Sequence, residues 1–244
     1  MLKDEIRQKL LEAYPIRLEL HAHTQPASGC GRVPGDKLAE NFKAAGYDGV
    51  VLTNHFSHGT LIDYYQPRDK RESLERYLAD YELAKRTGDR LGIRIYLGAE
   101  IRFENVNDND YLLYGMDEAL LGTAFDYIEA TPQDFYENGK DPRTLFIQAH
   151  PFRDHMTQLP PEYLDGFEVF NMHPGHNPRI AFAQRWADEN RIALKTIGTD
   201  YHYANYENLC AARFRVLPED SFALAEMLRA GDFIGEIGDN LIIF

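Results

Sequence analysis

Short runs of apolar residues alternate with longer amphipathic stretches along most of the chain. Seven of these runs have the length and the aliphatic or β-branched composition of buried strands. They are Ile16–Leu20, Val50–Asn54, Arg94–Ala99, Tyr111–Gly115, Leu145–Ala149, Phe167–Asn171 and Leu194–Thr199. Strands that alternate with helices are typical of α/β proteins, in which crossover helices join parallel strands.

Helices are predicted in most of the stretches between these strands. Leu74, Leu78 and Tyr81 recur at helical spacing, as do Ile180 and Trp186 in a later stretch. The predicted helices are residues 35–45, 70–91, 179–190 and 219–231.

The composition is that of one ordinary globular domain. Hydrophobic residues make up 44% and charged residues 27% of the 244 positions, and no repeat or linker divides the chain, so we expect a single domain over residues 1–244. No apolar run approaches the ~18 residues that cross a bilayer. The N-terminal residues alternate in charge and lack the apolar core of a signal peptide, and the two cysteines form no disulfide framework. We therefore expect a cytoplasmic protein that does not enter a membrane.

Acidic residues outnumber basic ones, which bears on possible partners. With 39 acidic and 26 basic residues, the formal net charge is −13. This field repels polyanions, so binding to a nucleic-acid polymer is not expected. A metal cluster would supply a local cationic site for a small anion.

Polar residues follow five of the seven apolar runs, in a pattern that packing does not require. In a barrel of parallel strands, these positions meet at the carboxyl ends, the face on which such folds build active sites. The residues are His21, His23, His55, Glu100, His150, Asp200 and His202.

These residue types point to a metal centre. Imidazoles and carboxylates without a thiolate cluster suit Zn, Mn or Fe. His21 and His23, like Asp200 and His202, are alternate residues of an extended segment and share a face. Any one of the histidines taken alone is more readily explained as a surface or core residue, whereas the seven residues together favour metal binding.

Five ordered motifs resemble the PHP (polymerase and histidinol phosphatase) superfamily of metal-dependent phosphoesterases. The motifs are His21-Ala-His-Thr24, Gly46-Tyr-Asp-Gly-Val-Val-Leu-Thr-Asn-His55, Gly98-Ala-Glu100, Ala149-His-Pro151 and Gly198-Thr-Asp-Tyr-His202. The resemblance implies a distorted (β/α)7 TIM-like barrel. It also implies that the seven strand-end residues are metal ligands. We expect two divalent ions and give Asp200 a catalytic role, in bridging the metals or orienting water.

Three departures from the family pattern concern individual metal positions. Asn54 stands where the family often has Asp, and residues 111–116 contain no histidine where three-metal members usually have one. A third metal position is therefore left open. After the first motif the family commonly places a further His or Asp, and Cys30 is the strong donor there; a small buried cysteine without function is the alternative.

Other polar residues near strand ends are candidates for substrate binding. Arg153 and Arg179 suit a phosphate, which arginine binds bidentately, although a surface salt bridge is the alternative for each. His176 lies with His173 in a loop rich in proline and glycine and is a candidate substrate contact or proton donor. The remaining histidines, His58 and His155, are assigned to the surface.

The resulting hypothesis is metal-dependent hydrolysis of a small phosphate monoester by a metal-activated water. The first alternative is a nucleotide phosphodiesterase or exonuclease that acts on nucleic-acid ends. The second is a catalytically silent metal-binding module. The substrate's identity and the oligomeric state are left open by the sequence.

Overall fold

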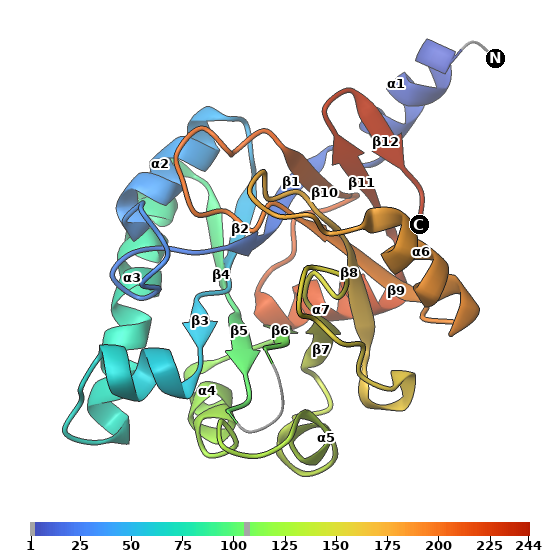
Figure 1. Ribbon diagram of the computed structural model, residues 1–244. Helices are drawn as coiled ribbons and strands as arrows, with labels where there is room; N and C mark the ends of the chain where they lie inside the picture. The colour runs from blue at the N-terminus through green and yellow to red at the C-terminus, as the bar shows by residue number, and fades with distance from the viewer. Residues whose placement is uncertain (1–2, 105–107) are drawn as a thin grey trace.

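A computed structural model describes residues 3–104 and 108–244 and confirms the α/β class. Figure 1 shows the strands at the centre and helices around them. The α-helices are α1 (Lys3–Ala13), α2 (Gly35–Ala44), α3 (Lys70–Leu91), α4 (Glu118–Phe125), α5 (Pro132–Asp134), α6 (Ile180–Glu189) and α7 (Ser221–Ala230). Shorter turns of π-helix or 3₁₀-helix are η1 (Gly59–Tyr64), η2 (Phe135–Gly139) and η3 (Pro161–Tyr163).

The described strands form two six-stranded sheets. The first sheet has the order β12-β11-β10-β1-β2-β4, and the second has the order β3-β5-β6-β7-β8-β9. The strands are β1 (Ile16–Ala22), β2 (Gly49–Leu52), β3 (His55–Phe56), β4 (Arg94–Leu97), β5 (Ala99–Arg102), β6 (Asp110–Tyr114), β7 (Leu145–Gln148), β8 (Gly166–Asn171), β9 (Leu194–Gly198), β10 (Cys210–Phe214), β11 (Phe233–Ile237) and β12 (Asn240–Ile242).

The two sheets meet along two seams but do not close into one barrel. On one side, β2 continues into β3 and β4 into β5, and backbone hydrogen bonds from Gly98 to Leu52 and from Glu100 to Asn54 carry the pairing across the break. On the other side, the end of β1 meets the segment after β9 through the isolated parallel bridge between Ala22 and Tyr201.

The prediction of an all-parallel sheet is wrong at β6. This strand pairs antiparallel with both β5 and β7. Residues 103–109 connect β5 to β6, whereas a parallel crossover needs a dozen or more residues. The sequence reading also missed the strand Cys210–Phe214, which pairs antiparallel with β1 and extends the first sheet together with β11 and β12.

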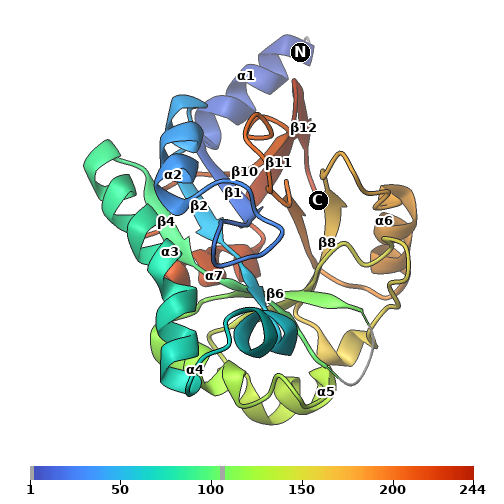
Figure 2. The same ribbon diagram turned by 60° about the vertical axis from the view of Figure 1, so that its left-hand side comes forward.

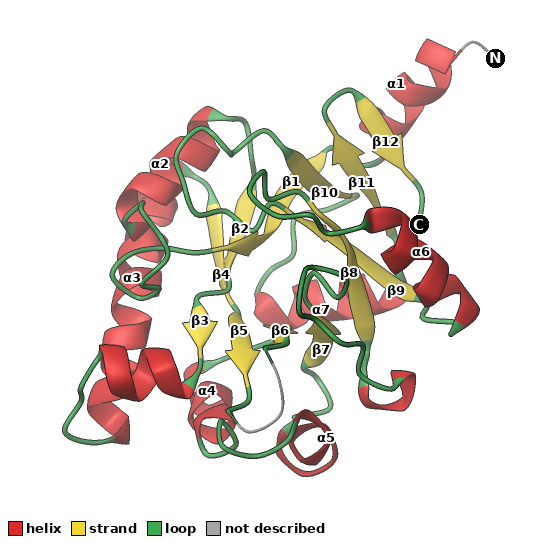
Figure 3. Cartoon of the chain, viewed as in Figure 1, coloured by secondary structure: helices red, strands yellow, loops and turns green. Residues whose placement is uncertain are grey.

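Helices cover both sides of the sheets. Helices α2 and α3 lie side by side along β2 and β4, and α6 covers β8 on the opposite side of the molecule (Figures 2 and 3). Phe42 and Ile95 belong to the core beneath α2 and α3, while Trp186 of α6 stacks on Phe167 of β8. No helix among the described residues is both long and apolar enough to span a bilayer.

A buried carboxylate joins β1 to the end of β9. Glu19 is 1% exposed and accepts hydrogen bonds from the backbone N–H groups of His21 and Thr199, at 2.8 and 2.9 Å. The Thr199 hydroxyl donates a third, at 2.6 Å. Burial raises the pKa of Glu19 to about 7, although the donors from Thr199 and His21 act to lower it. Glu19 therefore holds together the seam on which the strand-end residues converge.

We predict that Glu19→Ala lowers the free energy of unfolding by about 3 kcal/mol, because it leaves buried N–H groups without an acceptor. Glu19→Gln keeps an acceptor oxygen for both N–H groups and an amide that donates to the threonine hydroxyl, so we expect a loss below about 1 kcal/mol. Urea unfolding of both variants and the parent measures the difference. Equal stability of the two variants would contradict this role.

Candidate metal centre

The seam between β1 and the segment after β9 places two pairs of predicted ligands on one side. The N–H of Tyr201 donates to the carbonyl of His21 at 3.0 Å, and the N–H of His23 donates to the carbonyl of Tyr201 at 2.9 Å. Because side chains alternate along extended backbone, the residues that flank this bridge face the same way. His23 Nε2 lies 3.3 Å from Asp200 Oδ1 and His21 Nε2 lies 3.6 Å from it.

Strand register brings a second carboxylate to the same point. His55 of β3 and Glu100 of β5 are register partners on neighbouring parallel strands, and His55 Nδ1 is 2.8 Å from Glu100 Oε2. His150, after β7, places Nε2 3.0 Å from Glu100 Oε1. His21 and His23 approach the same carboxylate at 3.3 and 3.4 Å. Glu100 is therefore the centre of the cluster.

Mutual attraction sets the charges in this buried site. Burial would raise the pKa values of Glu100 and Asp200, yet the neighbouring histidines hold both well below the usual range. Burial would lower the pKa of His21, but Glu168, followed by the other carboxylates, raises it well above its ordinary value. His23, beside His202 and His55, has a pKa lowered well below the usual range by burial and by these two neighbours. Unlike charges thus stabilise one another where water is excluded.

The donor set fits divalent metal ions. Three groups of residues each have ligand atoms within 4.8 Å of one another. His23 belongs to two of these groups, and His55 also belongs to two. Glu100 Oε2 is buried and makes no hydrogen bond even though His55 Nδ1 is 2.8 Å away. Two such atoms, close together without a hydrogen bond between them, are arranged as two ligands of one cation would be. The groups are His23, Cys30, His55 and His202; His21, His23 and Asp200; and His55, Glu100 and Asp110.

Two of the strand-end residues have left-handed backbone conformations. His150 has a φ of 28° and Asp200 a φ of 55°. Each such conformation costs on the order of 1–3 kcal/mol for a residue other than glycine and is found mainly at functional sites. The strain is offset by the buried contacts that each side chain makes with the cluster.

Glu168 supports the cluster from beneath, and the sequence reading missed it. Its carboxylate accepts from the backbone N–H of His150 at 2.9 Å and lies 2.8 Å from His21 Nδ1. Such a partner fixes the tautomer and orientation of a metal-binding imidazole. Gly198 leaves space for this contact, because a Cβ at position 198 would lie 2.7 Å from Glu168 Oε1 and 2.5 Å from His21 Cβ. In the sequence, the feature from which Glu168 could have been predicted as a site residue is its charge inside the otherwise apolar run Phe167–Asn171.

Asn54, at the position where the family often has Asp, serves the loop after β1. Its Oδ1 accepts from the N–H of Thr24 at 2.7 Å and from the hydroxyl of Ser28 at 3.0 Å. Ser28 Oγ in turn accepts from the N–H of His55 at 2.8 Å. Asn54 therefore fixes the loop that carries Cys30 against the end of β2.

Asp110 is a carboxylate beside the cluster that belongs to one of the three ligand groups. It forms a group with His55 and Glu100, but both Arg102 and Arg153 donate to its carboxylate. The sequence reading missed it because the predicted strand began one residue later, at Tyr111. Two guanidinium groups therefore already compensate the charge of this carboxylate.

The three predicted substrate-binding residues lie at different distances from the cluster. Arg153 Nη2 is 3.2 Å from Asp110 Oδ2, which is 3.8 Å from His150 Nε2, so this arginine stands at the rim. His176 Nδ1 is 3.5 Å from Asp200 Oδ2. Arg179 instead donates to the carbonyl of Phe152 at 2.7 Å and to the carboxylate of Asp154. It braces the segment beside Arg153 rather than reaching the cluster.

The remaining histidines differ in their relation to the site. His173 stacks on His176, with ring centroids 4.1 Å apart, and burial lowers its pKa to about 4. His155 is exposed. His58 is half-buried and lies near Asp63 and Glu129, at 3.5 and 3.7 Å. The last two belong to none of the three ligand groups.

Comparison with known proteins gives similarity in structure but not in sequence. No protein-family model and no curated protein matches the chain. A two-domain protein from Bacteroides vulgatus that contains a predicted PHP-like metal-dependent phosphoesterase aligns with a TM-score of 0.64 and 16% identity over 93% of this chain. The alignment covers 66% of that protein, so the activity of the whole relative does not transfer to this chain.

Two further solved structures resemble the chain. PsfC from Pseudomonas syringae aligns with a TM-score of 0.54 and 18% identity, over 86% of this chain and 87% of that one. An amidohydrolase from Chromobacterium violaceum, solved with bound sulfate and no metal, aligns with a TM-score of 0.53 and 13% identity, over 78% and 89%. These likenesses, all below 20% identity, show a shared fold, and one of the similar structures contains a predicted PHP-like metal-dependent phosphoesterase.

Proposed function

We propose that this protein is a metal-dependent phosphoesterase that hydrolyses a small phosphate monoester. The observation that carries the proposal is the convergence of four buried histidines and the partly exposed His55 on Glu100 and Asp200, beside the cationic side chain of Arg153. We interpret the two joined sheets, which do not close and in which β6 is antiparallel to its neighbours, as a distorted variant of the (β/α)7 barrel that forms one domain. The similarity in fold to a PHP-like metal-dependent phosphoesterase supports both inferences.

The cluster has ligands for two divalent ions, which we propose to be Zn, Mn or Fe. The residues that would hold them are His21, His23, His55, Glu100, His150, Asp200 and His202. Bound there, such ions would supply Lewis-acid chemistry: they would polarise phosphoryl oxygens and lower the pKa of water to about 7. No protein nucleophile is then required.

The chain's own residues position the substrate and the proton. Arg153 has a side chain 21% exposed and faces the cluster, where its guanidinium binds phosphate oxygens. Arg179 holds the loop from which Arg153 projects. Hydrolysis adds water to phosphorus and breaks the bond to the leaving oxygen, which then needs a proton. His176, next to Asp200 and outside the most buried part of the cluster, is placed to donate it.

Three alternatives to this proposal are a nuclease, a metal-binding module without activity and an amidohydrolase. A nucleotide phosphodiesterase or exonuclease would share the metals, but the net charge of −13 disfavours long polyanions. A silent metal-binding module would release no product. The similarity in fold to an amidohydrolase adds amides to the substrates that an assay must include.

We predict that the protein binds two divalent ions per chain and that His23→Ala loses most of this capacity, because His23 belongs to two of the ligand groups. His155→Ala, which changes an exposed histidine, should bind as the parent does. Elemental analysis after reconstitution with Zn or Mn measures the stoichiometry. Less than one ion per chain in the parent would refute the cluster.

We predict that Asp200→Asn lowers kcat about 1000-fold while the fold is retained, because it removes a charge that both metal binding and proton transfer use. Asparagine tolerates the left-handed backbone at this position. The exposed Asp89→Asn is the matched control. Turnover of phosphate monoesters and circular dichroism report the two properties, and near-normal turnover in a folded Asp200→Asn variant would rule out the mechanism.

We predict that Arg153→Ala raises KM for a mononucleotide or phosphorylated metabolite about tenfold with little change in kcat, as expected for lost ground-state binding. Arg179→Ala should have a smaller effect, since its guanidinium binds the loop. The same assays with single-stranded DNA should give a lower kcat/KM. A preference for oligonucleotides, with Arg153→Ala neutral, would favour the nuclease.

A further inference from the structure

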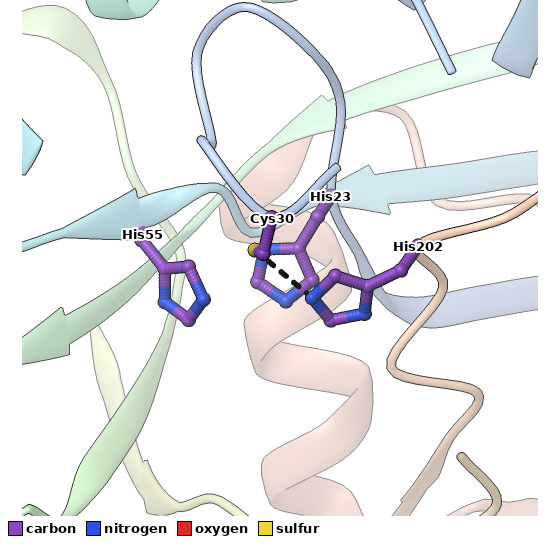
Figure 4. A group of neighbouring side chains, drawn as sticks. All are labelled: His23, Cys30, His55 and His202. Atoms are coloured by element: carbon purple, nitrogen blue, oxygen red, sulfur yellow. Dashed lines mark hydrogen bonds between the residues drawn. The ribbon is translucent and has the colours of Figure 1, made fainter. Parts of the chain in front are cut away.

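The loop between β1 and α2 places a thiol among three imidazoles. Cys30 Sγ is 3.0 Å from His202 Nε2, and the ligand atoms of Cys30, His23, His55 and His202 all lie within 4.8 Å of one another. Figure 4 shows the sulfur and the three rings turned toward a common space. The rings of His55 and His202 are centred 4.5 and 4.4 Å from that of His23.

The loop is built to hold the thiol in that place. Its ends are joined by a hydrogen bond from the N–H of Gln25 to the carbonyl of Val33. At the C-terminal end of the loop, the N–H of Arg32 donates to the carbonyl of His202, which ties the loop to the segment after β9. Gly31 passes so close to Thr24 that a Cβ would lie 2.7 Å from that residue's carbonyl carbon. The loop therefore has little freedom to turn Cys30 away.

The donors of this group differ in kind from those beside it. The neighbouring positions are formed by imidazoles and the carboxylates of Glu100, Asp110 and Asp200, whereas this group combines three imidazoles with one sulfur. Thiolate ligands favour Zn²⁺ over hard cations such as Mn²⁺ and Mg²⁺, which prefer oxygen. Three nitrogens and one sulfur also match the four-coordinate sets that zinc adopts in proteins.

We propose that Cys30, with His23, His55 and His202, forms a zinc-selective position whose metal preference differs from that of the adjoining carboxylate-bearing position. The inference rests on the proposed function only in requiring that the cluster binds metal. Binding releases the thiol proton to solvent and forms a metal–sulfur bond, with no change in oxidation state. The two adjoining metal positions are thus predicted to have different metal preferences.

Cobalt titration of the metal-free protein tests the proposal directly, because a cobalt–thiolate bond produces a near-ultraviolet charge-transfer band that imidazole and carboxylate ligands lack. We expect this band to saturate at one Co²⁺ per chain. It should disappear in Cys30→Ser and persist in Cys210→Ala, which changes the other, buried cysteine. Co²⁺ that binds without the band in the parent, or a band that survives in Cys30→Ser, would overturn the proposal.

Metal competition supplies a second measurement. Zn²⁺ should displace Co²⁺ from the thiolate band at a concentration about 100-fold lower than Mn²⁺ requires. In Cys30→Asp, which replaces sulfur by oxygen, the ratio of Mn²⁺ to Zn²⁺ dissociation constants measured by calorimetry should fall at least about tenfold. An unchanged ratio would show that Cys30 does not set the selectivity.

These measurements do not depend on catalysis. A protein that shows the band but hydrolyses no phosphate ester would support the zinc position and refute the proposed function. A protein that hydrolyses phosphate esters without the band would support the proposed function and refute the zinc position. Alkylation of Cys30 by iodoacetamide that bound Zn²⁺ fails to slow would show that the thiol does not bind the ion and would overturn the zinc position.

Discussion

The buried carboxylate of Glu100 organises the site, since four imidazoles lie within 3.4 Å of its oxygens. A carboxylate at 1% exposure is costly unless opposite charge accompanies it. His21 and His55, whose pKa values are raised well above the ordinary range by the carboxylates beside them, supply that charge in the metal-free protein, and bound cations would supply it in the loaded one.

Carboxylates outside the cluster determine where its ligands stand. Glu19 and Glu168 are each 1% exposed, and both accept hydrogen bonds from the backbone of ligand residues. Asn54 does the same for the loop that carries Cys30. Replacing His21 removes an imidazole partner from Glu168, so a change at that ligand also disturbs the residue that supports it. Metal affinity and stability are coupled through this layer.

The charge distribution limits what reaches the centre. The chain is strongly acidic as a whole, and Arg153 stands at the rim of the cluster, tied to Asp110. A compact anion gains from this local positive charge at short range, whereas a long polyanion also meets the negative surface beyond it. Selectivity for small substrates would thus follow from the contrast between the site and its surroundings.

The sequence by itself determined the α/β class, most strand positions and the residues that converge. Periodic apolar runs mark strands, and polar residues at their ends lie close in any fold that aligns those ends, so His21, His55 and Asp200 were accessible to sequence reasoning. Local pattern also predicted α3 over its full length from its apolar stripe, and the structure shows Asp69 capping its start and Gly92 in a left-handed conformation at its end.

Only the tertiary structure decided pairing direction and the supporting contacts. The direction of β6 depends on the short connection that precedes it, and apolar patterning is the same for either direction. Glu168 and Asp110 acquire their roles through residues far away in the chain, as Cys30 does through His202, 172 positions away. Such contacts arise from how strands and loops pack, and a local pattern carries no information about which distant side chain will lie within 3 Å.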